Sequence, residues 1–198
     1  MAYIEVIEKI GYDQVVLSLK AADVQATIKA YRLVHDKVDY PLHIGITEAG
    51  TLFKGTVKSA VGLGYLLLEG IGDTLRVSLS AHPKEEVQVA REILQAAGLR
   101  QFGPEVISCP TCGRCGIDLI ALVSEVEDKI ADIKEPIKIA VMGCAVNGPG
   151  EARQADFGIA GGKGSGLVFQ KGTVISKVSE DALVDTLLST IREYINSK

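Results

Sequence analysis

The chain has 198 residues with a formal net charge of −4, and 47% of them are hydrophobic, which is enough for one domain or two small ones with a real core. It has no basic run, which argues against nucleic acid or an anionic membrane as the main partner. It also has neither the start of a signal peptide nor an apolar run of roughly 20 residues, so we expect a folded cytoplasmic protein outside the membrane.

The first half of the sequence alternates between strand-like and helix-like patterns. Residues 1–10 have the pattern of a helix that stops at Gly11. Strands are expected at 14–20, 42–48, 74–79 and 105–108, with helices after the first three, the last of them ending at Gly98. This alternation indicates parallel β-α units with right-handed crossovers. About four such units form half of a TIM-type β/α barrel, whose open edges favour association with a partner.

Polar residues recur at the carboxyl ends of these strands. Lys20, Glu48 and Arg76 are spaced 28 residues apart, each at or near the end of its strand. The chemistry of β/α barrels gathers at this end, because the strands converge there and the loops are free to vary. A single charged residue at such a place is most often only solvated. Three charged residues at equal spacing, together with Ser78 and Cys109, indicate a functional site at the strand ends.

The second half of the sequence predicts a small α/β domain. A helix is expected at 117–133, strands at 137–142, 157–160, 166–170 and 173–177, and a last helix after Ser179. The glycine-rich residues 161–166 lack the spacing of a P-loop and precede no helix, so we interpret them as a hairpin turn rather than a phosphate cradle. The sequence thus predicts a barrel part at 1–108 and a second domain at 109–198.

All four cysteines lie within residues 109–151. Cys109, Cys112 and Cys115 follow one another at two-residue spacings, and Cys144 ends an apolar run. Clustered cysteines in a reducing compartment favour metal or cluster ligation over disulfides. Four thiolates suit either a [4Fe-4S] cluster or zinc. The three histidines all lie outside this region, which favours a cluster but leaves a zinc-stabilised binding domain as an alternative.

Longer motifs resemble those of a known family. They are Ser108-Cys109-Pro110-Thr111-Cys112, the 32-residue step to Cys144, and Gly143-Cys144-x-x-Asn147-Gly148-Pro149-Gly150-Glu151, with further matches over 42–50 and 70–78. These motifs resemble the 4-hydroxy-3-methylbut-2-en-1-yl diphosphate synthases, iron-sulfur oxidoreductases of isoprene biosynthesis by the non-mevalonate (MEP) pathway. The resemblance covers nearly the whole chain, while the amino-terminal half of the family's barrel has no counterpart in it.

The resemblance implies a [4Fe-4S] cluster held by Cys109, Cys112, Cys144 and the carboxylate of Glu151. A hard oxygen donor binds such iron more weakly than a thiolate, so one iron can accept a substrate oxygen. The implied reaction opens the ring of 2-C-methyl-D-erythritol 2,4-cyclodiphosphate and removes a hydroxyl, giving 4-hydroxy-3-methylbut-2-enyl diphosphate. Ferredoxin or flavodoxin would donate the electrons. Cys115 departs from the family pattern, and as a fourth thiolate ligand it would make a closed electron-transfer or sensor module, the competing hypothesis.

The resemblance also implies roles for residues near the substrate. Glu48 matches the acid/base carboxylate beside the leaving hydroxyl, Asn147 matches the asparagine beside cluster and substrate, and Glu151 is the third residue expected to take part in catalysis. The proteins of this family are homodimers, in which the cluster domain of one subunit caps the barrel of the other. We therefore expect a likewise homodimeric arrangement, and an isolated chain that is inactive or nearly so.

Binding of the cyclic diphosphate is expected at the strand ends. Lys20, Arg76 and Ser78 match diphosphate contacts of the family, and a cation with fork donors suits that charge. His43 is assigned to substrate binding with them, although a histidine inside a strand is equally consistent with a packed or hydrogen-bonded side chain.

Overall fold

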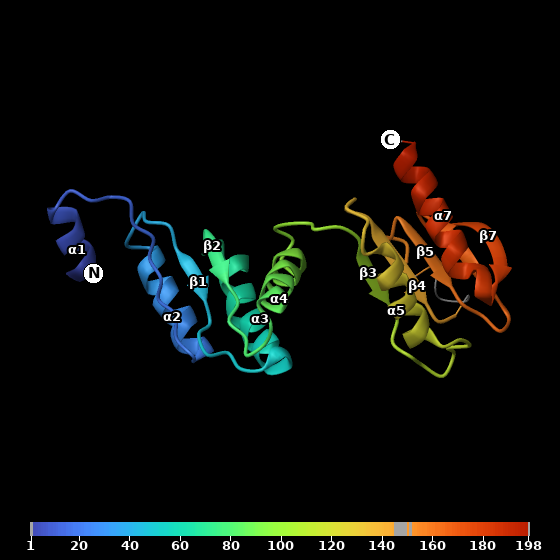
Figure 1. Ribbon diagram of the computed structural model, residues 1–198, viewed down its shortest axis with the longest axis horizontal. Coiled ribbons are helices and arrows are strands. Elements are labelled where there is room, and N and C mark those ends of the chain that lie inside the picture. The colour runs from blue at the N-terminus through green and yellow to red at the C-terminus, as the bar shows by residue number, and fades with distance from the viewer. Residues whose placement is uncertain (1, 145–149, 151, 198) are drawn as a thin grey trace. The chain divides into compact units, whose positions relative to one another are not determined.

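A computed structural model describes residues 2–144, 150 and 152–197. The chain forms two compact units, Met1–Gln101 and Phe102–Lys198, drawn from blue to red along the chain in Figure 1. None of the helices in these described ranges is long and apolar enough to cross a membrane.

The first unit contains four helices and a short parallel sheet. Its helices are α1 (Ala2–Lys9), α2 (Val24–His35), α3 (Leu52–Leu68) and α4 (Pro83–Ala96), and its strands are β1 (His43–Gly45) and β2 (Thr74–Arg76). Local signals set the helix ends. The Asp23 side chain accepts a hydrogen bond from the Ala26 N–H at the start of α2, and Pro83 begins α4. Gly98, with φ of 70°, ends α4 as predicted.

The strands of the first unit are shorter than predicted. Segment 14–20 contributes only a single parallel bridge, from Leu17 to Leu42, and not a full strand. Tyr31 of α2 fixes this segment instead, because its fully buried hydroxyl accepts from the Leu19 N–H and donates to the His43 carbonyl oxygen. The hydrophobic core lies between the strands and the helices and centres on Tyr31, Leu42, Ile44, Leu63, Leu66, Ile71 and Val77.

The second unit is built on a five-stranded sheet. Its elements are β3 (Glu105–Ser108), α5 (Leu119–Ile130), β4 (Lys138–Met142), β5 (Phe157–Ala160), β6 (Ser165–Gln170), β7 (Thr173–Ser179), the 3-10 turn Glu180–Ala182 and α7 (Leu183–Asn196). The strands follow one another in chain order, β3 to β5 parallel and β5 to β7 antiparallel. The glycine-rich segment joins β5 to β6 as the predicted hairpin.

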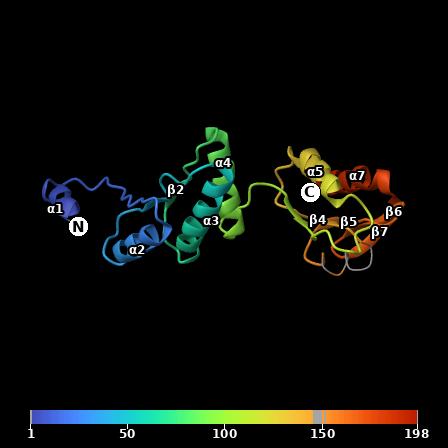
Figure 2. The same cartoon turned by 90° about the horizontal axis from the view of Figure 1, so that it is seen from below.

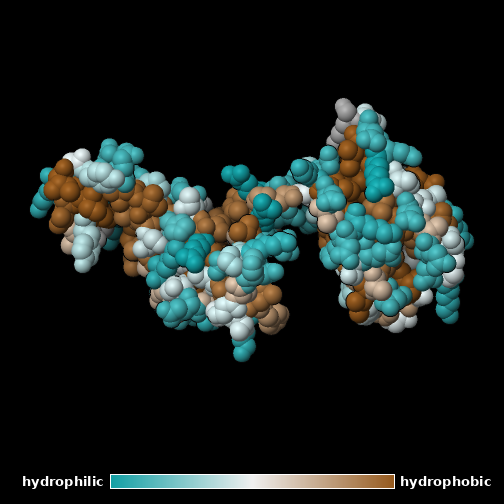
Figure 3. Space-filling model, viewed as in Figure 1, coloured by the Kyte–Doolittle hydropathy of each residue, from teal (hydrophilic) through white to brown (hydrophobic). Residues whose placement is uncertain are grey.

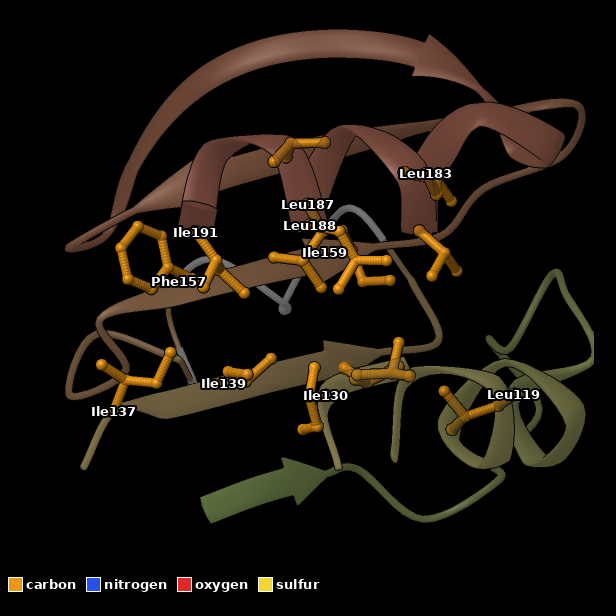
Figure 4. Packing of buried hydrophobic residues seen from close by; sticks show 14 residues of the cluster. Leu119, Ile130, Ile137, Ile139, Phe157, Ile159, Leu183, Leu187, Leu188 and Ile191 are labelled. Carbon is orange, nitrogen blue, oxygen red and sulfur yellow. The ribbon is translucent and has the colours of Figure 1, made fainter. Parts of the chain in front are cut away.

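Helices α5 and α7 cover one face of this sheet and contact each other (Figures 1 and 2). Figure 4 shows Leu187, Leu188 and Ile191 of α7 pointing toward Phe157 and Ile159 of β5. A smaller cluster on the other face consists mainly of alanines with Met142 and Phe169. The neighbouring parallel strands β4 and β5 are therefore buried on both faces, as expected for parallel strands rich in apolar residues.

The prediction of Glu105–Ser108 as the fourth barrel strand is wrong. This strand pairs in parallel with β4, with Glu105 beside Lys138 and Ser108 beside Val141. The predicted boundary after residue 108 thus falls inside the second unit, which begins at Phe102. The residues of a short β-rich run do not determine which sheet it joins. That depends on the distant strand with which it pairs.

Candidate functional site

The first candidate site lies at the carboxyl ends of β1 and β2. The two strands pair in parallel so that Gly45 lies beside Arg76. A Cβ on Gly45 would come within 2.9 Å of both the Lys20 Cε and the Arg76 carbonyl oxygen. The stem of Lys20 therefore crosses the end of β1 in space that only glycine leaves open, and the residue joins this strand end from the segment before α2.

Lys20, His43 and Arg76 form one electrostatic group, here called the cation group. Burial, and then the nearby positive charge of Arg76, lower the pKa of Lys20. Burial, and then the charges of Lys20 and Arg76, lower the pKa of His43 from its ordinary 6.5. His43 Nδ1 lies 2.8 Å from Thr74 Oγ1, and this contact orients the ring. Positive groups that repel one another at one place in this way are suited to bind a polyanion.

Glu48 and Ser78 follow the same two strands but are placed differently. Glu48 is exposed in the loop after β1 and has φ of 51°, a left-handed conformation that is strained for a residue other than glycine. It is not among the charges that shift the pKa of Lys20 or of His43. Ser78 is half-buried beyond β2. The structure thus groups three of the predicted substrate-binding residues, Lys20, His43 and Arg76, and leaves the predicted acid Glu48 outside that group.

The second candidate site is the cysteine loop, defined as residues 109–116. Because β3 and β4 are parallel and in register, the chain leaves both strands at the same edge of the sheet. The Gly143 N–H donates to the Cys109 Sγ at 3.2 Å, and the Gly116 N–H donates to the Gly143 carbonyl oxygen at 3.1 Å. The loop is therefore held at both ends against the residue that precedes Cys144.

Within this loop Cys115 is held by the protein itself. Its half-buried thiol donates to the Ile117 carbonyl oxygen at 3.3 Å, whereas Cys112 is exposed. A Cβ on Gly143 would lie 2.6 Å from the Cys115 Sγ, so this sulfur packs directly on the glycine. All four cysteines are free thiols. These contacts fix the Cys115 sulfur between Gly143 and the Ile117 carbonyl oxygen.

The thiols fit a soft metal or an iron-sulfur cluster by their chemistry. A backbone N–H directed at a cysteine sulfur, as at Cys109, is one of the interactions that tune cluster ligands. Among the described residues, no group of three or more His, Cys, Asp or Glu side chains is gathered closely enough to hold a metal ion. The predicted site residues Asn147 and Glu151 lie outside the described residues.

Sequence reasoning missed two glycines that shape these sites. Gly45 makes room for Lys20, and Gly143 makes room for Cys115. The signals available in the sequence were a glycine inside the expected strand 42–48 and a glycine directly after the expected strand 137–142. A glycine at such a place marks a close approach of another group to the backbone.

The fold and sites define an α/β protein with a cation group at parallel strand ends and a thiol-bearing loop at the edge of a second sheet. Comparison with known families agrees with this class. Residues 1–91 match the GcpE TIM-barrel domain, and residues 105–193 match the GcpE protein C-terminal domain. The chain belongs to the GcpE family.

Curated relatives carry the name 4-hydroxy-3-methylbut-2-en-1-yl diphosphate synthase (flavodoxin). The protein of Geobacter sulfurreducens is 56% identical over 198 residues, 100% of this chain and 56% of the relative. The protein of Brevibacillus brevis is 52% identical over 100% of this chain and 55% of its own length. The protein of Geobacillus thermodenitrificans is 57% identical over 96% of this chain and 50% of its own length. The chain thus spans about half the length of the curated relatives it matches.

Proposed function

We propose that this chain carries substrate-binding and cluster-binding parts of a 4-hydroxy-3-methylbut-2-en-1-yl diphosphate synthase. The reaction is the reductive ring opening of 2-C-methyl-D-erythritol 2,4-cyclodiphosphate in the MEP pathway of the cytoplasm. The observation that carries this proposal is the cation group, because a cyclic diphosphate needs several positive donors at one place. The names of the relatives at 52–57% identity support the same reaction.

The cation group binds the diphosphate of the substrate. Arg76 offers fork donors to two phosphate oxygens and Lys20 supplies a compact charge, while the Ser78 hydroxyl donates one further hydrogen bond. Burial, and then mutual repulsion, now lower the pKa of Lys20 and of His43. A bound diphosphate would offset the repulsion, so both side chains would bind protons more tightly in the complex. His43 then adds either a hydrogen bond or a third charge.

The carboxylate of Glu48 is the proposed proton donor to the hydroxyl that leaves as water. Its left-handed backbone conformation places it at the start of a loop rather than on the strand, a position from which a side chain can meet a substrate held at the strand end. Asn147 is proposed to lie beside the substrate.

Cys109, Cys112, Cys144 and Glu151 are proposed to hold a [4Fe-4S] cluster. The cluster would supply two electrons, received from flavodoxin, the donor printed in the relatives' names, or from ferredoxin. The chain's own contribution is orientation. The Gly143 N–H directs the Cys109 sulfur, and the Gly116 to Gly143 bond fixes the loop.

The arrangement of the parts is also proposed. The first unit is part of a TIM barrel and the second is the cluster domain, which in a homodimer caps the barrel of the other subunit. Because the chain spans about half the length of the relatives it matches, these 198 residues alone should bind the substrate weakly and turn it over slowly or not at all.

The competing function, a closed electron-transfer or sensor module with four thiolate ligands, needs Cys115 as a ligand. In the structure this thiol is hydrogen-bonded to the Ile117 carbonyl oxygen and packed on Gly143. Such a module also has no use for Lys20 and Arg76 beside each other. These two observations favour the synthase.

Calorimetric titration of the anaerobic chain with the cyclic diphosphate tests the proposal. Lys20→Met and Arg76→Met should each weaken binding roughly 10- to 100-fold, the effect of losing one charge-assisted hydrogen bond to an anion. Lys29→Met, which removes an exposed lysine of α2, is the matched control and should leave binding unchanged. Equal losses in all three variants, or none in the first two, would contradict substrate binding at the cation group.

A further inference from the structure

The segment that carries Lys20 follows the register of a parallel strand beside β1 on both sides of this residue. Before it, Leu17 forms the parallel bridge with Leu42. After it, the Thr47 N–H donates to the Ala21 carbonyl oxygen at 3.2 Å. In a parallel ladder the bonded partners advance by two residues on each strand, so both contacts belong to one register. The ladder is interrupted between them without a shift.

A side chain takes the place of a ladder bond at Leu19. Continued in this register, the Leu19 N–H would donate to the His43 carbonyl oxygen. The Tyr31 hydroxyl lies between the two groups instead, because it accepts from the Leu19 N–H at 2.9 Å and donates to the His43 carbonyl oxygen at 2.7 Å. The Ser18 hydroxyl also donates to this oxygen, at 3.1 Å. The interruption is therefore built by α2 and does not come from a frayed strand.

Thr27 replaces the next ladder bond in the same way. In a continued ladder the Ala21 N–H would donate to the Gly45 carbonyl oxygen. It donates to the Thr27 Oγ1 at 3.2 Å instead, and this hydroxyl donates to the Asp23 carbonyl oxygen at 2.8 Å. Thr27 and Tyr31 are four residues apart on α2, so both hydroxyls leave the helix on one face. Both residues are fully buried, and they are here called the hydroxyl pair.

Lys20 lies inside the interruption, between the two backbone N–H groups that the hydroxyl pair holds. At Leu19 the bridge replaces one donor–acceptor distance by two, of 2.9 and 2.7 Å, so the backbone is set back from β1. The Lys20 side chain crosses back toward β1, where its Cε lies 2.9 Å from the position of a Cβ on Gly45. The stem of Lys20 thus occupies the space that the interruption and Gly45 leave open.

We infer that Tyr31 and Thr27 are positioning residues for Lys20. They hold its backbone off β1 so that the ammonium group joins His43 and Arg76 at the strand ends. A binding group whose backbone is fixed by packed side chains is aligned more closely than one on a free loop. The inference rests on the proposed function, because it assigns to α2 the alignment of a cation that binds the diphosphate.

Removal of a hydroxyl has a defined effect on the backbone. In Tyr31→Phe the Leu19 N–H and the His43 carbonyl oxygen lose their bridge, and the pairing left to them is the direct ladder bond. Closing that bond draws the segment onto β1 and moves Lys20 away from its place over Gly45. The loss of one aligned charge on an anion should weaken binding of the cyclic diphosphate roughly 10-fold.

Calorimetric titration of the chain with the cyclic diphosphate tests the positioning role. Tyr31→Phe and Thr27→Val each remove a hydroxyl and keep the shape of the side chain, so each should weaken binding roughly 10-fold. Thr27→Ser keeps the hydroxyl but loses a buried methyl group, so it should melt earlier and still bind as the wild type does. Ser59→Ala is the matched control. Ser59 is a fully buried residue of α3 whose hydroxyl has no hydrogen-bond partner among the described residues, so its loss should leave binding unchanged.

A double-mutant cycle separates positioning from a general loss of structure. In a Lys20→Met background, Tyr31→Phe and Thr27→Val should cause no further loss of affinity, because they act through Lys20. Hydrophobic side chains lie on the surface of the chain (Figure 3), and aggregation of a variant would imitate weak binding. Sedimentation velocity must therefore show the same species for every variant.

The pKa of His43, measured by NMR titration, gives a readout without substrate. Lys20→Met should raise this pKa less in the Tyr31→Phe chain than in the wild type, because the bridge no longer holds the lysine charge beside the ring. An equal rise in both chains would overturn the positioning role. So would wild-type affinity in Tyr31→Phe and Thr27→Val, or losses that are the same with and without Lys20. If Lys20→Met itself leaves binding unchanged, the proposed substrate site is wrong, and the pKa of His43 still decides whether Tyr31 positions Lys20.

Discussion

Gly143→Ala tests how the cysteine loop is held. The added Cβ would lie 2.6 Å from the Cys115 Sγ, well inside van der Waals contact, while its distance to the Cys115 Cβ is 3.4 Å and to the Leu119 Cδ2 3.5 Å. The sulfur cannot turn away without losing its hydrogen bond to the Ile117 carbonyl oxygen. Overpacking of this kind costs about 2 kcal/mol, which lowers the melting temperature of a chain of this size by roughly 4 to 8 °C.

The double variant Gly143→Ala/Cys115→Ala separates this clash from other effects. Cys115→Ala alone removes a half-buried thiol and should cost about 1 kcal/mol. Because it removes the only atom that the new methyl group meets closely among the described residues, the double variant should be no less stable than Cys115→Ala. Urea unfolding of the metal-free chain measures the free energies of unfolding. The coupling energy should be about 2 kcal/mol in favour of the double variant.

A Gly143→Ala chain as stable as the wild type would refute the close packing of Cys115 on Gly143. The packing would also be refuted if the losses of stability in the two single variants simply added in the double variant. The strain of Gly143→Ala would then come from a contact other than the one with Cys115.

Three further predictions concern the first unit. Lys20→Met should raise the pKa of His43, measured by NMR titration, because of the two positive charges near the ring Lys20 has the larger effect. Burial should still keep the pKa below 6.5, and Lys29→Met should leave it unchanged. Since the unfolded chain binds the His43 proton more tightly than the folded one, stability should rise with pH from the lowered pKa up to 6.5, and this rise should shrink in His43→Gln. Gly45→Ala should weaken binding of the cyclic diphosphate, seen by calorimetry, because its Cβ would displace Lys20 from the strand end; undiminished affinity would show that Lys20 needs no such space.

Local patterns predicted the helices well. Residues 52–68 form α3 as expected, and α4 stops before Gly98, because helical period and end signals lie within a few residues of each other. Pairing of strands depends on distant residues. Segment 14–20 has the composition of a strand but pairs only at Leu17, and Glu105–Ser108 joins the second sheet rather than the first.

The candidate sites were predicted in part. The 28-residue spacing led to Lys20 and Arg76, which the structure places together with His43. The spacing of the cysteines gave no means of telling that Cys115 turns toward Gly143 while Cys112 faces solvent, because that depends on how the loop folds against β4. The same limit applies to Glu48, whose backbone conformation no pattern of side chains indicates.

Iron and sulfide analysis after anaerobic reconstitution tests the cluster site most directly. The expected result is about four irons and four sulfides per chain in the wild type. Cys115→Ser should keep this content, and Cys109→Ser should lose it. Zinc in place of iron, or a cluster lost in Cys115→Ser and kept in Glu151→Ala, would contradict a three-thiolate site completed by Glu151 and would favour the closed alternatives.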